Sequence, residues 1–406
     1  MIIRQDSFFS YDDLMEISPK TRLMMILDEI DVSPVATAMG KTPGTRGPKG
    51  YPKERLLYAL LAKEVEQIPK ISSLVRRLES DPAFRYACGF GIMDKTPSES
   101  VFSRFQDALS KEPTLMELFQ NLVISAFKSG IIDGAEVAID STKLSSYEAS
   151  KPRKDIVDDG NHPNWGMKRD TNGNNIRWFG WKLHIICDAK SELPLFIKVT
   201  PASVHDGSVA SAMIRDFLDS YEGLIKPSHY LMDSGYDYEY LYGDIVDKYH
   251  ATPIIAYNPR GSKAPPEGLN EKLHPVCSAG YELKYWGKDA TYMKFRCPHM
   301  TGDVNCPFGS NWCSSSNYGL TLKLNYRKNP RIHGYPLRNS KTWKNLYNKR
   351  TSVERLNARL KENLNVDGIR SKGIKKALMH CLLNCIALVA GTIAINKKSS
   401  VITKAA

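Results

Sequence analysis

The apolar positions in the first third of the chain repeat at the spacings of short amphipathic helices. A helix that begins at Pro52 carries two leucine pairs four residues apart on one face: Leu56, Leu57, Leu60 and Leu61. Other helices are expected over 22–30, 71–78 and 101–109. Glycine and proline are frequent in residues 40–50, which are therefore expected to form a linker. The pattern predicts an all-helical N-terminal domain at 1–125.

From about residue 135 the apolar positions form the runs that are typical of strands. Two of these runs, Glu136–Asp140 and His229–Asp233, are predicted to end in a carboxylate. The remaining elements are strands at Trp181–Asp188, Leu195–Thr200 and Thr252–Ala256, and helices at Ser208–Tyr221 and Tyr238–Lys248. A short polar turn joins the second and third strands, which predicts an antiparallel hairpin. This order of elements predicts a mixed sheet with helices on its faces.

A stretch of different composition interrupts the alternation of strands and helices. Residues 257–341 are rich in proline, glycine, asparagine and cysteine, and they are predicted to be an insertion with sheet or loop character. The sheet domain is therefore expected in two parts, 126–256 and 342–396, followed by a tail at 397–406. Its second part is predicted to begin with a long helix from Thr342 to Leu364.

An apolar run from Ala377 to Ile395 has about the length of a membrane span. It contains His380 and Asn384, whose polar groups would be costly among lipid chains. The sequence therefore favours a buried helix of a soluble protein, with no membrane as partner. A membrane span is the alternative interpretation.

Positive charge is concentrated in one region of a chain whose formal net charge is +12 and whose isoelectric point is about 9.1. Between Leu322 and Lys376 sixteen Lys or Arg residues face three acids, Glu354, Glu362 and Asp367. A stretch of this kind can follow a phosphate backbone and release its counterions on binding. A polyanionic partner such as DNA is therefore expected.

Half of the eight cysteines lie in the predicted insertion: Cys277, Cys297, Cys306 and Cys313. Four thiols so close in sequence suit a structural Zn²⁺ site, in which His299 offers a substitute ligand. The spacings lack a C-x2-C pair, so free or buried cysteines are the alternative. The low cysteine content and an N-terminus without signal-peptide features favour the cytoplasm.

The predicted helix at 345–364 separates polar from apolar residues. At about 100° per residue, one face collects Tyr347, Arg350, Glu354 and Lys361, and another collects Val353, Leu356, Leu360 and Leu364. An ordinary surface helix with an ion pair between Arg350 and Glu354 explains the carboxylate. It does not explain why nearly all the neighbouring charges are cationic. A carboxylate among cations suits a metal site beside a phosphate-binding surface.

The same residues resemble a known family. The spacing Tyr347-x2-Arg350-x3-Glu354-x6-Lys361 is similar to the Y-R-E-K signature of one group of bacterial insertion-sequence transposases. Asp140 in AIDST and Asp233 in MDSGYD resemble the first two acids of the DDE triad of these enzymes. The segments GWKLHIICD and TPASVHDGS resemble the family's hairpin and following helix. The resemblance covers about 135–256 and 342–390, and the helices at 50–110 resemble the family's N-terminal domain.

The resemblance implies an α/β fold with a ribonuclease-H-like mixed sheet and flanking helices. An all-α N-terminal domain would precede it, and the cysteine-containing segment would interrupt it. Asp140, Asp233 and Glu354 would be the catalytic acids and would bind two Mg²⁺ or Mn²⁺ ions. The residues implied to contact DNA are Tyr347, Arg350, Arg355 and Lys361.

The expected activity is that of a DDE transposase, which cleaves DNA at element ends and transfers the freed 3′ hydroxyl to target DNA. The alternatives are a metal-dependent nuclease of the same fold and a DNA-binding protein derived from a transposase. The expected partners are element ends, target DNA and a second copy of the chain, in a bacterial cytoplasm and at the nucleoid during action. The N-terminal helices form a DNA reader of helix-turn-helix type or a plain bundle or dimerisation module. His205 and Asp206 either contact the site or form an ordinary turn.

Overall fold

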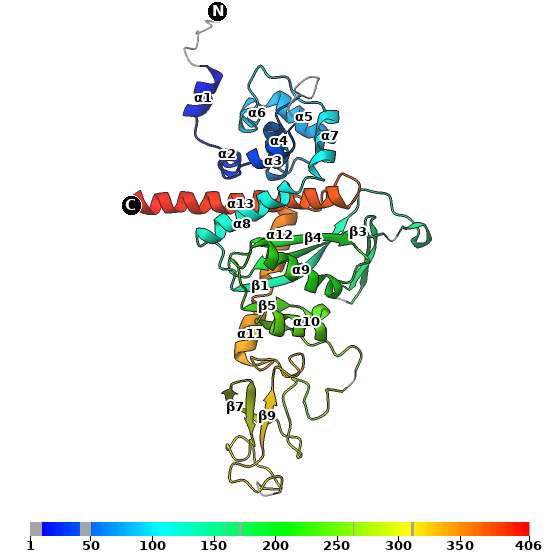
Figure 1. Cartoon of the computed structure of the whole chain (residues 1–406), viewed down its shortest axis with the longest axis vertical. Helices are drawn as coiled ribbons and strands as arrows, with labels where there is room; N and C mark the ends of the chain where they lie inside the picture. Colours follow the sequence, from blue (N-terminus) through cyan, green and yellow to red (C-terminus); the bar gives the residue numbers. More distant parts are fainter. Residues whose placement is uncertain are drawn as a thin grey trace, which may run out of the picture.

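The structure is a computed structural model that describes residues 10–40, 50–157, 159–169, 173–262, 264–309 and 312–405. The linker expected at 40–50 falls almost entirely outside the described residues. The N-terminal helices lie at one end of the molecule and the insertion at the other, with the sheet between them (Figure 1). The long helix α13 crosses between the N-terminal helices and the sheet (Figure 1).

The N-terminal domain is helical, as predicted. Its helices are α1 (Tyr11–Ile17), α2 (Arg22–Leu27), α3 (Ser33–Ala38), α4 (Lys53–Val65), α5 (Ile71–Ser80), α6 (Pro82–Ala87), α7 (Glu99–Leu109) and α8 (Thr114–Lys128). The leucine stripe of α4 is buried, because Leu56, Leu57, Leu60 and Leu61 are each at most 1% exposed. The helix α8, which the pattern did not predict, leads directly into the sheet domain.

The central sheet is mixed, as predicted, and contains β1 (Glu136–Ser145), β2 (Asn164–Arg169), β3 (Asn175–Asp188), β4 (Pro194–Pro201), β5 (His229–Met232) and β6 (Thr252–Ile255). The strand order is β2-β3-β1-β5-β6, and β4 also pairs with β3. The strand β3 is antiparallel to β1, β2 and β4, which confirms the hairpin, while β1, β5 and β6 are parallel. The strand β2 was not predicted.

One prediction about the strand ends is wrong. The strand β1 does not end at Asp140 but continues to Ser145, because β3 supplies antiparallel partners as far as Gly180. Asp140 is therefore an interior residue of β1. The strand β5 ends at Met232, so Asp233 does follow its strand directly.

Helices cover both faces of the sheet (Figure 1). The first face carries α9 (Asp206–Ser220), and β5 and β6 are joined by α10 (Glu239–Gly243) and a π-helical turn. The second face carries α12 (Thr351–Glu362) and α13 (Ile374–Ala405), with α11 (Lys341–Asn348) preceding them.

The long helix predicted from Thr342 to Leu364 is divided, which corrects the prediction. Around Lys349 and Arg350 the backbone hydrogen bonds join residues three apart rather than four, as in the bond from the Arg350 N–H to the Tyr347 carbonyl. Such a tighter turn rotates each residue by about 120° instead of 100°. Tyr347 and Glu354 therefore belong to two helices, α11 and α12.

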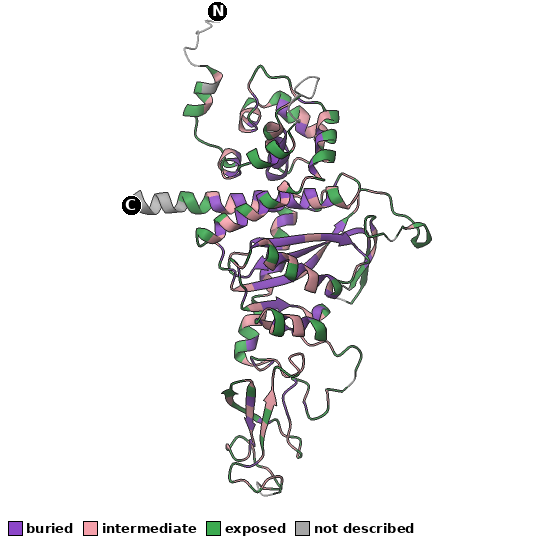
Figure 2. Cartoon of the chain, viewed as in Figure 1, coloured by how far each residue is buried: buried purple, intermediate pink, exposed green. Residues whose placement is uncertain are grey.

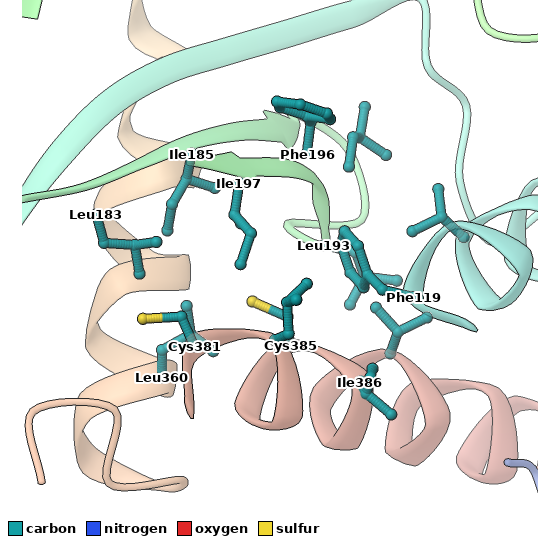
Figure 3. Packing of buried hydrophobic residues seen from close by; sticks show 14 of the residues in the cluster. Phe119, Leu183, Ile185, Leu193, Phe196, Ile197, Leu360, Cys381, Cys385 and Ile386 are labelled. Atoms are coloured by element: carbon teal, nitrogen blue, oxygen red, sulfur yellow. The ribbon is translucent and has the colours of Figure 1, made fainter. Parts of the chain in front are cut away.

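The helix α13 forms the centre of the core, as the buried-helix interpretation predicted. Cys381 and Cys385 of this helix face Leu183 and Ile197 of the sheet (Figure 3). The helix is long and apolar enough to cross a membrane by length and composition alone. However, 67% of its most apolar stretch is buried inside the protein, and Figure 2 shows buried residues along much of the helix. The backbone of the predicted tail continues α13 as far as Ala405.

The polar residues of α13 bind the N-terminal domain. His380 Nδ1 lies 3.4 Å from the Glu64 carboxylate of α4, and the Asn384 amide donates to the same carboxylate at 3.4 Å. Lys63 is 2.9 Å from it as well. Burial opposes the charge of Glu64, but His380 and Lys63 hold its pKa below the ordinary value. The buried charges are thus paired, as burial in a core requires.

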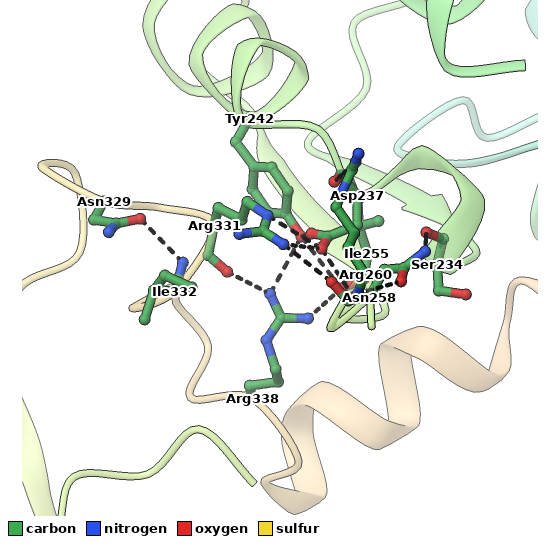
Figure 4. A network of polar contacts seen from close by, with 10 residues as sticks. All are labelled: Ser234, Asp237, Tyr242, Ile255, Asn258, Arg260, Asn329, Arg331, Ile332 and Arg338. Atoms are coloured by element: carbon green, nitrogen blue, oxygen red, sulfur yellow. Dashed lines mark hydrogen bonds and ion pairs between the residues drawn. The ribbon is translucent and has the colours of Figure 1, made fainter. Parts of the chain in front are cut away.

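The insertion contains a small antiparallel sheet of β7 (Lys284–Asp289), β8 (Tyr292–Arg296) and β9 (Thr321–Asn325). A polar network joins it to the sheet domain (Figure 4). The buried carboxylate of Asp237 accepts hydrogen bonds from Arg331 at 2.8 Å, from the Tyr242 hydroxyl at 2.9 Å and from the Asn258 N–H at 2.9 Å. Arg338 contacts the Tyr242 hydroxyl at 3.2 Å.

Replacing Asp237 with alanine is expected to lower the free energy of unfolding by about 3 kcal/mol, because breaking a buried ion pair leaves the partner charge uncompensated. Denaturant unfolding followed by circular dichroism measures this change. The matched control is Asp303→Ala, which removes an exposed ion pair with Lys284 in the same insertion. Equal stability of the two variants would contradict the anchoring role of Asp237.

Candidate active site

Asp140 and Asp233 are brought together by the parallel pairing of β1 and β5. The last pair in this register is Ile139 with Met232, so each aspartate immediately follows a paired residue on an adjacent strand. Asp140 stands opposite Ile185 of β3, and directly opposite residues project from the same face of a sheet. Because Ile185 faces α13 (Figure 3), the Asp140 side chain also projects towards the face that carries α12.

A tight turn fixes the side chain of Asp233. Asp233 caps the 3-10 turn η2 (Ser234–Tyr236), and its Oδ1 accepts the N–H of Gly235 at 2.8 Å. A Cβ at position 235 would come within 2.9 Å of that oxygen, so a larger residue there would displace the Asp233 carboxylate from this position. The motif MDSGYD is therefore a device that holds a carboxylate at the end of β5.

The electrostatics show that the two aspartates interact. Burial, and after it the neighbouring charge of Asp233, raise the pKa of Asp140 to about 6. The backbone N–H of Ser141 and the charges of Lys168 and Arg350 act in the opposite direction. A carboxylate whose charge is disfavoured by burial and by a neighbouring carboxylate belongs to a donor set that a hard divalent cation would stabilise. The residues present therefore fit Mg²⁺ or Mn²⁺.

Glu354 lies in the first turn of α12 and is paired with Arg350. The Arg350 guanidinium is 2.8 Å from the Glu354 carboxylate, and it also attracts Asp140. The Glu354 side chain is 52% exposed, whereas that of Arg350 is only 18% exposed. The Nε atom of Arg350 is buried and has no hydrogen-bond partner in the part of the chain that the structure describes. Arg350 thus interacts electrostatically with both Glu354 and Asp140.

Tyr347 belongs to the same group of side chains. Its ring is stacked on Trp343 at 4.7 Å between centroids, and the Arg350 guanidinium lies 5.6 Å from its centre. Burial raises the pKa of Tyr347, and the charges of Asp233 and Glu354 contribute to the rise. The structure therefore places Tyr347, Arg350 and the three predicted acids in one electrostatic environment.

Two other predicted DNA contacts lie elsewhere. Lys361 donates to the backbone carbonyl of Lys143 at 3.3 Å and lies 3.5 Å from Asp367. Arg355 is paired with Glu192, in the turn between β3 and β4, at 2.5 Å. Neither cation is among the groups that act most strongly on the pKa of Asp140. Their contact with DNA stays a prediction.

Among the described residues, no three His, Cys, Asp or Glu side chains converge closely enough to hold a metal ion. At the candidate site, Glu354 is paired with Arg350 and is not gathered with Asp140 and Asp233. In the insertion, Cys297 is buried, while His299 Nδ1 accepts the N–H of Cys306 at 3.3 Å. The zinc set of Cys277, Cys297, Cys306 and Cys313 stays a prediction.

A buried polar cluster lies on the opposite face of the sheet. Lys182 Nζ is 3.0 Å from Asp206 Oδ1, and His184 Nε2 is 2.8 Å from the Thr200 hydroxyl. Burial lowers the pKa of His184 to about 4, so the ring is neutral at pH 7. His205 caps α9 by accepting the Gly207 N–H at 3.2 Å. His205 and Asp206 thus lie in the turn that begins α9, as one of the two interpretations of this pair predicted. Asp206 also belongs to the polar cluster with Lys182.

Two residues near the acids were missed in the sequence. Lys168 is exposed on β2, a strand that was not predicted, and it attracts Asp140. Tyr236 is fully buried at the end of η2. The motif MDSGYD contains this tyrosine, but its composition does not distinguish a core ring from one near the acids.

Comparison with known families identifies transposase domains in the chain. Residues 131–390 match the family model described as "Transposase DDE domain", and residues 12–108 match the model described as "Transposase domain (DUF772)". One similar solved structure is titled "Cryo-EM structure of piggyBac transposase synaptic complex with hairpin DNA (SNHP)". It is 12% identical with a TM-score of 0.39, covering 93% of this chain and 75% of that chain. No curated protein matches the chain significantly.

In the metal-free protein, the contribution of Asp140 to stability is expected to fall as the pH rises from about 4 to above 6. The folded-state pKa of Asp140 lies above its ordinary value of 3.8, so folding favours the protonated acid. This stabilisation is complete below pH 4 and is lost as the pH passes through about 6. Thermal unfolding in EDTA, compared between wild type and Asp140→Asn, measures it. The same pH dependence in both proteins would contradict the assignment.

Proposed function

The chain belongs to the family of transposases with a DDE domain, enzymes that cleave DNA and transpose it, and we propose how its own residues perform this chemistry. We assign Asp140, Asp233 and Glu354 as the catalytic acids. The observation that carries the assignment is the parallel register of β1 and β5, which places Asp140 and Asp233 side by side, together with the ion pair of Arg350 and Glu354. The matched family model includes all three acids.

The three acids would hold divalent cations of the Mg²⁺ or Mn²⁺ type. Bound there, such ions would activate an oxygen nucleophile and stabilise the leaving oxygen. The family is expected to need these ions, and the donor set fits them, because carboxylate oxygens are their preferred protein ligands. We propose that Asp140, Asp233 and Glu354 would together hold two such ions.

The ion pair between Arg350 and Glu354 suggests how DNA completes the site. A guanidinium binds a phosphate through two parallel hydrogen bonds, as it does a carboxylate. We propose that a DNA phosphate replaces Glu354 on Arg350, and that the released carboxylate then turns towards Asp140 and Asp233. Support comes from the partial exposure of Glu354 and from the buried Nε of Arg350.

The proposed reaction has two steps. Water attacks the phosphorus at the element end, forming one P–O bond and breaking another, which frees a 3′ hydroxyl. That hydroxyl then attacks a phosphodiester of the target, so a second P–O bond forms while the target strand is broken. The Arg350 side chain would hold the phosphate, and Tyr347 would support Arg350 through its ring.

DNA is the partner that the family membership supports. We propose that the cations of residues 322–376 contact its backbone, with Lys168 as an additional contact beside Asp140. A homodimer on DNA is proposed because two element ends must be brought together. Action in the cytoplasm suits the buried thiols of Cys187, Cys381 and Cys385. A structural Zn²⁺ in the insertion is also proposed, and zinc analysis of the purified protein tests it.

Purified protein incubated with Mg²⁺, a labelled element end and a supercoiled target plasmid is expected to yield cleaved ends and joined product. Asp140→Ala is expected to lose both activities because a cation ligand is removed. Gel electrophoresis of the labelled strand measures both products. Cleavage without joining would assign the protein as a nuclease, and full activity of Asp140→Ala would contradict the assigned site.

Arg350→Ala is expected to weaken DNA binding about tenfold, as loss of a charged hydrogen-bonded contact predicts, and to reduce the salt dependence by about one phosphate contact. Fluorescence anisotropy with Ca²⁺ in place of Mg²⁺, at several salt concentrations, measures this effect. Arg215→Ala is the matched comparison, because Arg215 is an exposed arginine outside residues 322–376 that is paired with Asp216. An equal loss in both variants would contradict a special role of Arg350 at the acids.

A further inference from the structure

The small sheet of the insertion has one buried face and one exposed face. In β8 the buried residues are Met293 and Phe295, which are each 1% exposed and belong to the core of the insertion. Successive side chains of a strand point to opposite faces. The residues that alternate with them, Tyr292, Lys294 and Arg296, therefore project from the other face, towards solvent. This sheet lies at the end of the molecule away from the N-terminal domain (Figure 1).

Cations stand directly opposite one another on the exposed face. The strand register places Arg296 opposite Lys284 of β7. It also places Lys294 opposite Lys323 of β9. Like charges at opposite positions of an antiparallel pair are destabilising, because their side chains project from the same face with Cβ atoms about 5 Å apart. Two such pairs at neighbouring positions of β8 therefore lower the stability of the free protein.

Acids compensate these four cations only in part. Lys284 and Lys294 lie 2.8 Å and 2.9 Å from an aspartate, and both ion pairs are exposed, so each contributes little. Arg296 and Lys323 have no ion pair within the part of the chain that the structure describes. A polyanion lying along the face would relieve the repulsion, as the phosphates of a nucleic acid do for lysine and arginine.

Exposed aromatic rings accompany the cations. The Arg296 guanidinium lies 4.3 Å from the ring centre of Trp286 and 4.9 Å from that of Tyr318. Trp286 is 53% exposed, Tyr318 63% and Tyr292 41%. Because large rings gain free energy when they are buried, exposed rings beside a row of cations indicate a ligand that has flat apolar surfaces as well as negative charge.

Unpaired nucleotides combine these two properties. Lysine and arginine neutralise their phosphates, while aromatic rings stack on their bases. In a duplex each base is already stacked between its neighbours, so a ring on a sheet surface gains a base contact only where the base is unpaired. The exposed face of the insertion therefore suits a single strand better than a duplex.

We propose that single-stranded DNA binds this cation–aromatic face, which is formed by Lys284, Trp286, Lys294, Arg296, Tyr318 and Lys323. The phosphates would lie along the two cation pairs, and a base would stack on Trp286. This inference rests on the proposed function for DNA as the partner. It adds a binding surface on the insertion, separate from the acids of the central sheet.

Trp286→Ala in the full chain tests the stacking. Fluorescence anisotropy with labelled oligothymidylate in EDTA is expected to show about tenfold weaker binding than wild type, the size of a lost base–ring stack. A labelled hairpin duplex is expected to bind both proteins equally.

Trp312→Ala is the matched control for this variant. Trp312 is also an exposed tryptophan of the insertion, but it belongs to none of the three strands and stacks on Phe308 at 4.6 Å. Wild-type affinity of Trp286→Ala for oligothymidylate, an equal loss in Trp312→Ala, or an equal loss for the duplex would overturn the proposal.

Lys323→Glu tests the cations through two opposite effects. The new acid would stand opposite Lys294, so amide hydrogen exchange in β8 and β9, followed by mass spectrometry, is expected to slow. Oligothymidylate is expected to bind less tightly, and the slope of log affinity against log salt is expected to fall by about 0.7 or more. The control is Lys272→Glu, since Lys272 is an exposed cation of the insertion outside its sheet, 3.7 Å from Glu282.

Unchanged affinity of Lys323→Glu, or the same loss in Lys272→Glu, would overturn the role of the cations. Lys323→Gln keeps the test valid if the charge reversal disturbs the sheet. This variant removes the charge without adding an acid, and it is expected to bind oligothymidylate less tightly at unchanged hydrogen exchange. Wild-type affinity of Lys323→Gln would equally overturn the proposal.

A cleavage assay separates this inference from the proposed function. If wild type does not cleave element ends but Trp286→Ala and Lys323→Gln still bind oligothymidylate less tightly than wild type, the proposed function fails and the surface stands. If wild type cleaves and both variants bind oligothymidylate as wild type does, the proposed function stands and the surface is rejected.

Discussion

The parallel pairing of β1 with β5 is the constraint on which the site depends. It places Asp140 and Asp233 on adjacent strands just past their last shared pair, Ile139 with Met232. The electrostatic cost of holding the two carboxylates together is seen in the pKa of Asp140, which burial and then Asp233 raise to about 6. A fold that forces two acids together stores an electrostatic cost that bound cations relieve. The apolar strands on both sides stabilise this arrangement, because burial of their side chains offsets the repulsion.

The third acid depends on a different part of the core. The helix α12 packs its apolar residues, among them Leu356 and Leu360, under the sheet, and this packing determines where Glu354 lies. The helix α13 then covers α12, the sheet and α8 together, and its His380 pairs with Glu64 of the N-terminal domain. The N-terminal domain and the acid site therefore share one continuous core.

The sequence predicted the parts of this fold that follow from local periodicity. The leucine stripe of α4, the hairpin and the buried helix α13 were all confirmed, since each depends on hydrophobic spacing. The end of β1 was misplaced because strand length depends on the partner β3, which no local pattern reveals. The break between α11 and α12 was missed because the backbone there keeps helical dihedrals and only its hydrogen bonds change. The burial of Tyr236 was missed for a similar reason, since it depends on tertiary packing.

The ion pair of Arg350 with Glu354 would make cation binding at the site depend on bound DNA. While Glu354 is bound to Arg350, two acids face the cation position, and fewer ligands bind a divalent ion less tightly. A DNA phosphate on Arg350 would release the third ligand, so DNA would increase metal affinity. By thermodynamic linkage, the metal would then increase DNA affinity by the same factor. Such coupling would restrict the activated oxygen nucleophile to complexes that already hold the substrate.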